Sequence, residues 1–301
     1  MAGDATTNVG RTGSAAGGAR GGPPGPSSGP SAASLAFLQA LIARRASIEI
    51  GSERRTLWIS RLNPVAKAGG LASIDELVAA LQAGNRDLER DVVDAMTTNE
   101  TMFFRDGPVF ESIVTEVLPA MIDRVGGTGR VTIWSGASSS GQEVYSLAML
   151  IDRLHPELVR SGRVRILASD LSTTMVERTR AGRYSTLEAR RGLTDADLGT
   201  YFERDGDHWV VGPRLKRMVL CRQLNLMDSL DPIPRCEIVL LRNVLIYFSD
   251  HDRLDILRRV KERVLRPDGA LVLGSSELIG SGERFYTSER LANGFSFRPR
   301  R

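Results

Sequence analysis

Two acidic residues and a loop of small residues stand where a polar ligand could bind. The loop 136–141 follows the apolar run 131–134 and precedes a helical pattern, so its backbone can approach a ligand closely at a helix start. Glu143 lies in the first turn of that helix. Asp170 follows a second apolar run, 164–169, where an acidic side chain can accept hydrogen bonds from both hydroxyls of a ribose. Asp170 could equally cap the next helix.

The loop does not match the common nucleotide-binding motifs. Gly136 and Gly141 have the G-x-x-x-x-G spacing of a phosphate loop, but Gln142 and Glu143 stand where that loop has lysine and serine or threonine. A carboxylate at this place would face the phosphates, which makes triphosphate binding unfavourable. The G-x-G-x-x-G fingerprint of dinucleotide-binding folds is absent from the sequence as well.

Two further segments combine polar residues with aromatic ones. Segment 97–106, TTNETMFFRD, has polar side chains that favour turns and caps, and two phenylalanines that could be site anchors or ordinary core. Segment 242–248, RNVLIYF, follows a buried apolar run, so Asn243 and Val244 should face the ligand crevice at the carboxyl end of a parallel strand. Tyr247 comes one helical turn after Asn243 and could face the same crevice or be a half-buried aromatic.

In their order, these segments resemble the chemotaxis receptor glutamate methyltransferases, which use S-adenosyl-L-methionine (AdoMet). TTNETMFFRD meets the family pattern T-T-N-x-T-x-F-F-R at every defined position, and RNVLIYF matches R-N-V-x-I-Y-F. WSGASSSGQEVYSLAM follows W-S-x-A/G-x-S-x-G-E-E-P-Y-S-L-A-M, and ASDLSTTMVERTRAGRY follows A-x-D-I/L-x-T-x-x-L/V-x-x-A-R-x-G-x-Y. The departures are Gln142 for Glu, Val144 for Pro and Thr179 for Ala. The resemblance covers about residues 34–299.

The resemblance implies an AdoMet cofactor and a set of site residues. The positions that match the family's cofactor contacts are Asn99, Thr101, Arg105, Glu143, Asp170, Asn225, Leu226, Asn243 and Val244. The positions that match its catalytic residues are Arg105 and Tyr247. Arg105 could hold the carboxylate of the cofactor's methionine end or that of the substrate, and Tyr247 could orient the substrate.

The same resemblance implies a chemotaxis protein methyltransferase. Such an enzyme transfers a methyl group from AdoMet to glutamate side chains of chemoreceptors, and the resulting methyl esters serve sensory adaptation. A glutamate carboxylate, with a pKa near 4.3, is already a nucleophile at neutral pH and needs no general base. The three histidines and two cysteines are scattered, which fits such a reaction and predicts neither a metal site nor a disulfide. Two alternatives stay open: an AdoMet-dependent methyltransferase of another acceptor, and a non-catalytic AdoMet-binding regulator.

We expect two domains after a tail. Residues 1–33 are rich in glycine and proline and poor in apolar side chains, which is typical of a disordered segment. Residues 34–106 have helical periodicity and predict an all-helical N-terminal domain, whereas strands alternate with helices in residues 107–301. This alternation predicts an α/β fold with a doubly wound, mostly parallel sheet, and the resemblance implies that this fold is of the AdoMet-dependent methyltransferase type. We expect a last edge strand at residues 294–299.

A segment of about residues 200–222 breaks this alternation and predicts a small antiparallel β subdomain insertion. Its Asp-Gly pair is typical of a hairpin turn, and residues 208–211 and 215–220 should form its strands. In some members of the resembled family this subdomain docks on a tethering peptide at the receptor's tail. Trp209 could pack within the hairpin or serve such docking.

Charge gives a candidate docking surface for the protein substrate. Basic residues cluster in the helical region: Arg44, Arg45, Arg54, Arg55, Arg61 and Lys67. The cluster could be an ordinary solvated face, or it could dock on an acidic, glutamate-bearing receptor helix. The net charge of +4 does not by itself indicate nucleic acid. No apolar run reaches the roughly 18 residues of a membrane span or resembles a secretory signal, so we expect a cytoplasmic protein without membrane insertion. A chain of this length can bury a sizeable core without oligomerisation, so we also expect a monomer.

Overall fold

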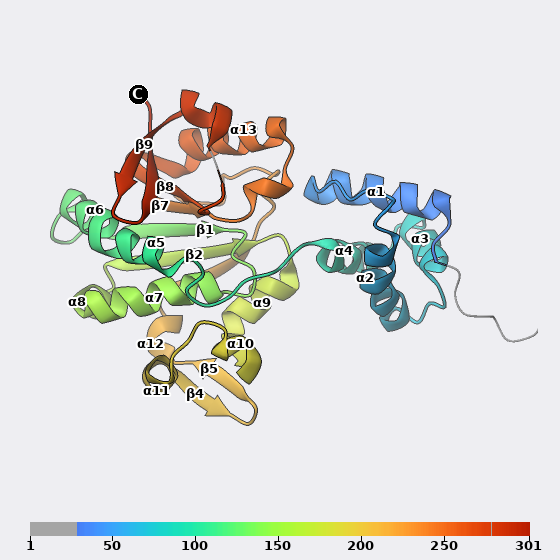
Figure 1. The fold of residues 1–301 in the computed structure, drawn as a ribbon, viewed down its shortest axis with the longest axis horizontal. Coiled ribbons are helices and arrows are strands. Elements are labelled where there is room, and N and C mark those ends of the chain that lie inside the picture. The colour runs from blue at the N-terminus through green and yellow to red at the C-terminus, as the bar shows by residue number, and fades with distance from the viewer. Residues whose placement is uncertain (1–28, 278) are drawn as a thin grey trace, which may run out of the picture.

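The computed structural model describes residues 29–277 and 279–301. Most of the predicted tail, residues 1–33, therefore lies outside the described residues. Near the start of the described part, the hydroxyl of Ser31 accepts a hydrogen bond from the backbone N–H of Ser34 and caps the first helix. Figure 1 shows a small helical part beside a larger part that holds the sheet.

Four helices lie in the described part before residue 97: α1 (Ala32–Ala46), α2 (Arg55–Ala68), α3 (Ile74–Gln82) and α4 (Arg86–Met96). Their apolar residues recur at helical spacing and therefore meet in one core. Its fully buried side chains include Leu38, Trp58, Leu62, Leu77 and Val92. Side-chain oxygens of Ser73 and Asn85 cap α3 and α4 at their N-termini.

The larger part contains a seven-stranded sheet with the order β6-β2-β1-β7-β8-β10-β9 within the described residues. Five neighbouring strands are parallel: β1 (Val131–Gly136), β2 (Val164–Asp170), β6 (Val219–Gln223), β7 (Cys236–Leu241) and β8 (Leu265–Leu273). The other two strands, β9 (Tyr286–Leu291) and β10 (Gly294–Pro299), run antiparallel to their neighbours. The carboxyl ends of β1, β2, β6 and β7 consequently meet at one edge of the sheet.

Helices cover both faces of this sheet (Figure 1). One face carries α5 (Gly107–Ser112), the π-helical turn Ile113–Val117, α6 (Leu118–Val125), α7 (Gln142–Leu154) and α8 (Pro156–Arg160). The other face carries α13 (Asp250–Arg259) and the π-helical turn Val260–Val264 that continues it. A further helix, α9 (Thr173–Ala181), contacts β2 and β6. A hydrophobic core lies on each face of the sheet. Val131 and Ile133 of β1 pack into one of these cores and Trp134 packs into the other, so the sheet is buried on both sides. The predicted doubly wound α/β fold is thus confirmed.

A separate three-stranded antiparallel sheet has the order β3-β5-β4. It consists of β3 (Arg183–Ser185), β4 (Phe202–Asp205) and β5 (His208–Val211), with α10 (Thr186–Arg190) and α11 (Asp195–Tyr201) inserted between the first two strands. The Asp-Gly hairpin turn lies where we predicted it, and Gly206 there has a φ of +57°. Trp209 is half-buried in this hairpin, with the guanidinium of Arg204 4.8 Å from its ring.

The predicted limits of the insertion, 200–222, are wrong at both ends. The small sheet begins at Arg183, and the expected second hairpin strand at 215–220 does not form. Pro213 instead begins a short helix, α12 (Pro213–Lys216), because proline suits the first turn of a helix. The chain then enters β6, which pairs in parallel with β2 of the large sheet, so Val219 is buried there and not in the hairpin.

The predicted strand at 294–299 exists, but it is not an edge strand. It lies between β8 and β9, and β9 forms the edge. In β9 only Tyr286 and Leu291, its two end residues, are buried, so its sequence has no apolar alternation that would have revealed it. Edge strands with polar side chains are common because they discourage pairing with other chains.

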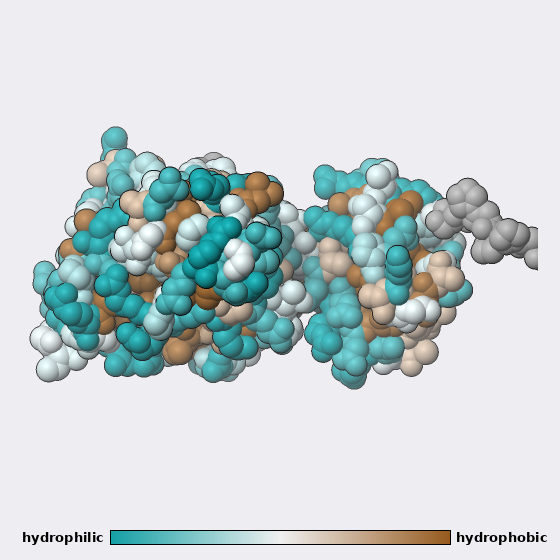
Figure 2. All heavy atoms as spheres, turned by 90° about the horizontal axis from the view of Figure 1, so that it is seen from below, coloured by the Kyte–Doolittle hydropathy of each residue, from teal (hydrophilic) through white to brown (hydrophobic). Residues whose placement is uncertain are grey.

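Among the described residues, no helix combines the length and the hydropathy that crossing a membrane would require. In the view of Figure 2, hydrophilic residues dominate the surface of both parts, and apolar residues form scattered patches.

Candidate active site

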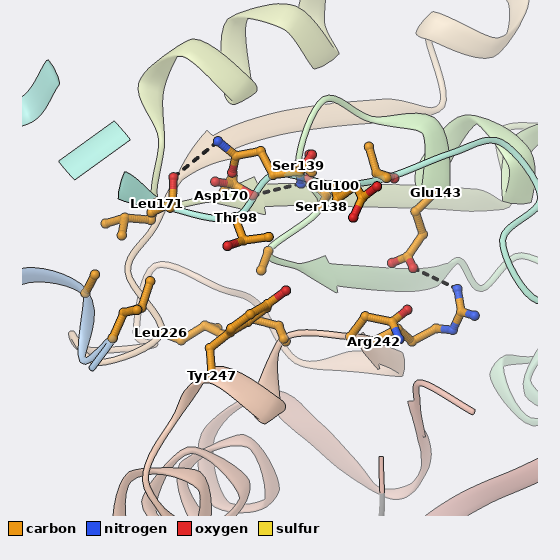
Figure 3. A pocket seen from close by; sticks show the side chains of 18 of the residues that line it. Thr98, Glu100, Ser138, Ser139, Glu143, Asp170, Leu171, Leu226, Arg242 and Tyr247 are labelled. Carbon is orange, nitrogen blue, oxygen red and sulfur yellow. Dashed lines mark hydrogen bonds and ion pairs between the residues drawn. The ribbon is translucent and has the colours of Figure 1, made fainter. Parts of the chain in front are cut away.

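A pocket opens at the carboxyl ends of β1, β2, β6 and β7, on the side that faces the N-terminal helices (Figure 3). Its empty volume is about 960 Å³ when the open mouth is included. All ten residues that the sequence singled out line it: Asn99, Thr101, Arg105, Glu143, Asp170, Asn225, Leu226, Asn243, Val244 and Tyr247. The structure thus brings these residues together, while their individual roles stay predictions.

The small-residue loop after β1 forms one wall of the pocket through Ala137, Ser138 and Ser139. Ala137 and Ser139 have φ values of +56° and +52°, a conformation that non-glycine residues rarely adopt outside functional sites. Gly141 has a φ of +93°, and a Cβ there would come within 2.8 Å of Thr179. The loop is therefore a fixed, tightly packed turn whose backbone lies against the pocket, as we predicted for a ligand loop.

Asp170 lies at the end of β2 and is 6% exposed. One carboxylate oxygen accepts a hydrogen bond from the N–H of Ser139 at 2.8 Å, and the other accepts one from the N–H of Ser172 at 3.0 Å. Burial raises the pKa of Asp170 to about 6, although both hydrogen bonds lower it. Asp170 therefore supports the loop and the start of the next helix, and it still lines the pocket with acceptor capacity for a ligand's hydroxyl groups.

The buried side chain of Arg242 forms an ion pair with the half-buried Glu143 on the opposite wall (Figure 3). Arg242 contacts one carboxylate oxygen of Glu143, and the hydroxyl of Ser135 donates to the other at 2.8 Å. Arg242 also pairs with Asp106 at 2.8 Å and donates to the backbone oxygen of Arg105 at 3.1 Å. We did not assign Arg242 a role from the sequence. One signal was available in the sequence: Arg242 directly follows an apolar strand. A charged side chain at such a place is buried, and buried charges need partners.

Arg105 is held in the pocket by the segment around it. Phe103 is fully buried and packs edge-on against Tyr184 and Phe202, with ring centroids 4.9 and 5.7 Å apart. The N–H of Phe104 donates to the hydroxyl of Ser146 at 2.8 Å. The guanidinium of Arg105 makes one long hydrogen bond, 3.4 Å to the backbone oxygen of Glu100, and no carboxylate of the described residues lies within 4 Å of it. It is therefore free to bind a ligand carboxylate.

The loop after β7 supplies Asn243, Val244 and Tyr247 to the pocket. Asn243 has a φ of +57°, and Tyr247 ends a short 3₁₀ helix, Leu245–Tyr247. Figure 3 shows the Tyr247 ring pointing toward the pocket interior, so the interpretation of Tyr247 as a residue that faces the crevice agrees with its position. A buried carboxylate from the next loop, Glu277, holds this segment and was also missed from the sequence.

The N-terminal helical region contributes to the same pocket. Ala46 and Ile48, at and just beyond the end of α1, line it. The side-chain amide of Asn225 donates to the backbone oxygen of Arg45 at 2.8 Å, and its oxygen accepts a hydrogen bond from Met227. We expected Asn225 to contact the cofactor. Periodicity could not show that its side chain would also donate to the end of a helix 180 residues earlier.

The lining has the donors and acceptors that AdoMet requires. Asp170 can accept from ribose hydroxyls, Glu143 can accept from an ammonium group, and Arg105 can bind a carboxylate. The pocket wall contains no histidine, cysteine or lysine within the described residues. In the same part of the chain, no three metal-binding side chains cluster, and Cys221 and Cys236 are free thiols. The residues present therefore fit AdoMet.

Comparison with known proteins agrees with this fit. A family model described as CheR methyltransferase, SAM binding domain, matches residues 99–292, where SAM is another abbreviation of S-adenosyl-L-methionine. Chemotaxis protein methyltransferase 1 of Pseudomonas aeruginosa is 40% identical over 270 residues, which cover 88% of this chain and 97% of that protein. Chemotaxis protein methyltransferase Cher2 of Pseudomonas putida is 40% identical over 247 residues, which cover 80% of this chain and 88% of that protein. All ten predicted site residues lie inside the matched range, and the chain belongs to the CheR methyltransferase family, whose S-adenosyl-L-methionine-binding domain it contains.

Proposed function

We propose that the protein is a chemotaxis protein-glutamate O-methyltransferase that methylates glutamate side chains of chemoreceptors in the cytoplasm. The names of the two Pseudomonas relatives support the assignment to chemotaxis. The observation that carries the choice of a carboxylate acceptor is that no histidine, cysteine or lysine of the described residues lines the pocket. An amine or hydroxyl acceptor must lose a proton, whereas a glutamate carboxylate is already ionised at neutral pH.

Two acidic residues of the lining, Glu143 and Asp170, have other partners, which supports this view. Glu143 pairs with Arg242, and Asp170 binds two backbone N–H groups. Glu100 lies 3.9 Å from the guanidinium of Arg191. Glu143 and Asp170 therefore suit a binding or positioning role better than that of a proton acceptor, whereas the side chain of Glu100 is 77% exposed and has only this long contact.

In this proposal the residues of the chain act by binding and alignment. When bound, AdoMet supplies a methyl group on a positively charged sulfur. Asp170 binds the ribose hydroxyls, Glu143 binds the ammonium group, and Arg105 binds either the carboxylate of the methionine end or the substrate carboxylate. Tyr247 orients the acceptor at the pocket mouth. Holding both reactants in line can contribute about 7–11 kcal/mol to lowering the barrier, so alignment can replace acid–base chemistry.

We further propose that exposed basic residues of the helical region guide an acidic receptor helix to the pocket. The structure reduces the number of candidates among the six basic residues of this region, because three of them contact other residues of the protein. Arg61 donates to the backbone oxygens of Ala95, Met96 and Thr97 at 3.3, 3.1 and 2.8 Å and so caps the end of α4. The guanidinium groups of two others have partners as well: Arg45 pairs with Glu89, and Arg55 donates to the backbone oxygen of Pro30.

Arg44, Arg54 and Lys67 are exposed. None of them forms an ion pair with a described residue. These three side chains therefore remain the candidates for attraction to an acidic receptor helix.

Methyl transfer from labelled AdoMet to a receptor cytoplasmic fragment tests the proposal. We expect incorporated label that is released as methanol by mild base, because a glutamate methyl ester is base-labile. A matched fragment with its acidic helix positions changed to glutamine should take up no label. Base-stable label would indicate another acceptor group, and AdoMet binding without any transfer would indicate a non-catalytic regulator.

A further inference from the structure

Glu277 is a buried carboxylate that has no role in the mechanism above. It follows β8 and is 7% exposed. One of its oxygens accepts hydrogen bonds from the N–H of Asn243 at 2.6 Å and from the N–H of Gly274 at 2.8 Å. The other oxygen accepts one from the N–H of Ile246 at 3.3 Å. The carboxylate thus binds the loop after β7 at two points: at Asn243, near the start of the loop, and at Ile246, the residue before Tyr247.

This carboxylate has no cationic partner among the described residues, since no arginine, lysine or histidine nitrogen lies within 4 Å of it. A buried negative charge requires compensation, and here backbone N–H groups supply it. Hydrogen bonds to an ionised acceptor are roughly twice as strong as neutral ones. Glu277 is therefore a firm anchor for two separate points of the loop.

The loop needs such an anchor, because its backbone is strained. Asn243 has a φ of +57°, a conformation that persists only where the surrounding structure enforces it. Gly274 packs directly against it: a Cβ on Gly274 would come within 2.7 Å of both the Asn243 side-chain nitrogen and the Glu277 carboxylate. Backbone contact on one side and charge-assisted hydrogen bonds on the other therefore fix Asn243 in place.

We propose that Glu277 is a positioning residue for methyl transfer, which holds the cofactor-binding and the substrate-orienting halves of the loop after β7 in one fixed relation. It acts through Asn243 at one end and through Ile246, and hence Tyr247, at the other. The inference rests on the proposed site roles of Asn243 and Tyr247. It predicts that one side chain outside the pocket's chemistry affects both cofactor affinity and turnover.

Glu277→Gln tests the proposal, since it keeps the shape but replaces one acceptor oxygen with an NH₂ group that faces backbone donors. In the protein without cofactor, we expect amide hydrogen exchange at Asn243 and Ile246 to accelerate by about tenfold or more. The Kd for AdoMet should rise about fivefold or more in calorimetry. Turnover should fall roughly 10- to 100-fold, because small misplacements at an active site are that costly, while the KM for the receptor fragment stays within about twofold.

Glu237→Gln is the matched control. Glu237 is similarly buried, at 5% exposure, and lies near the start of β7, the strand whose carboxyl end leads into the loop that Glu277 contacts. It accepts from the N–H of Thr132 at 2.7 Å and from Arg266 at 2.8 Å. Its loss should lower thermal stability and leave the AdoMet Kd and the turnover within about twofold of wild type.

Unchanged exchange at the two amides together with an unchanged Kd for Glu277→Gln would overturn the proposal. Equal effects of both glutamine variants on Kd and turnover would also overturn it, since Glu277 would then contribute only general stability. If Glu277→Gln does not fold, Gly274→Ala disturbs the same loop from its other side and should give the same exchange and affinity pattern. If Asn243→Ala and Tyr247→Phe leave Kd and turnover unchanged, the proposed site roles fail, and amide exchange still decides whether Glu277 braces the loop.

Discussion

Nη1 of Arg242 lies 2.9 Å from Oε2 of Glu143, in an ion pair whose arginine side chain is 1% exposed. The same guanidinium binds Asp106 at 2.8 Å and lies 4.5 Å from the centre of the Phe110 ring. Arg242 therefore joins the end of β7 to the start of α7 and to the residue that follows Arg105. This one buried guanidinium thus fixes the positions of Glu143 and Asp106 relative to each other.

Replacing Arg242 with methionine should strongly destabilise the protein. The change keeps most of the side-chain volume but leaves the carboxylates of Glu143 and Asp106 without their buried partner, which typically costs about 3–5 kcal/mol. The double variant Arg242→Met/Glu143→Gln should lose less than the sum of the two single variants, because it removes the orphaned charge. Chemical unfolding of all three variants measures this coupling. Additive losses would show that the pair contributes nothing specific.

Asp170→Ala should weaken AdoMet binding by more than about 1.5 kcal/mol. The ribose hydroxyls would lose hydrogen bonds to an ionised acceptor, and each such bond typically contributes about 1.5–3 kcal/mol. Calorimetry at neutral pH measures the change, with circular dichroism to verify folding. Unchanged affinity in a folded variant would return Asp170 to its role as a support for Ser139 and Ser172.

AdoMet binding and stability should respond to pH in opposite directions through Asp170. Burial raises its pKa to about 6, so protonation below that pH removes an acceptor, and AdoMet affinity should fall as pH decreases through about 6. The folded pKa lies above the unfolded value of 3.8, so the stabilising contribution of the protonated group is complete below about pH 4 and is lost as pH rises through 6. Asp170→Asn should flatten both profiles. A wild-type affinity that is constant between pH 5 and 7.5 would contradict the assignment.

Arg105→Ala should depress turnover far more than stability. The guanidinium has one long hydrogen bond to Glu100, so little of the fold depends on it. If it binds a reacting or cofactor carboxylate, its loss should lower kcat/KM by about 100-fold or more, which is usual when one aligned donor at an active site is removed. Thermal unfolding and methylation kinetics of the same preparation separate the two effects. Proportional losses in both would give Arg105 a structural role.

Arg54→Glu and Arg61→Glu should have different consequences. Arg54 is exposed, so its reversal should raise the KM for the receptor fragment at low salt, lose this effect at high salt, and change stability by under about 0.5 kcal/mol. Arg61 caps α4 through three backbone oxygens, so its reversal should lower the melting temperature. An Arg54→Glu variant with a wild-type KM at low salt would show that the basic surface does not guide the substrate.

The sequence revealed those features that depend on residues close together in the chain. The apolar runs of β1, β2 and β7 are short and end at polar residues, so a site at their carboxyl ends could be predicted. The resemblance to the methyltransferase family supplied the full set of ten proposed residues. The features that could not be predicted depend on contacts between residues far apart in the chain. Arg242 finds Glu143 and Asp106 99 and 136 positions earlier, and Glu277 finds Asn243 34 positions earlier. No local pattern encodes such contacts.

The hydrogen bond between Asn225 and the backbone of Arg45, with Ala46 and Ile48 in the pocket wall, limits how this enzyme can be recombined. A chimera that exchanged the first four helices for those of a relative, in order to transfer receptor preference, would also exchange part of the pocket wall. Asp94 adds to this, since it accepts a hydrogen bond from the hydroxyl of Thr174 at 3.1 Å on the catalytic side. Chimeras that take residues 45–48 and Asp94 from the same parent protein as Asn225 and Thr174 should preserve cofactor affinity. Chimeras that take them from different parents should lose affinity.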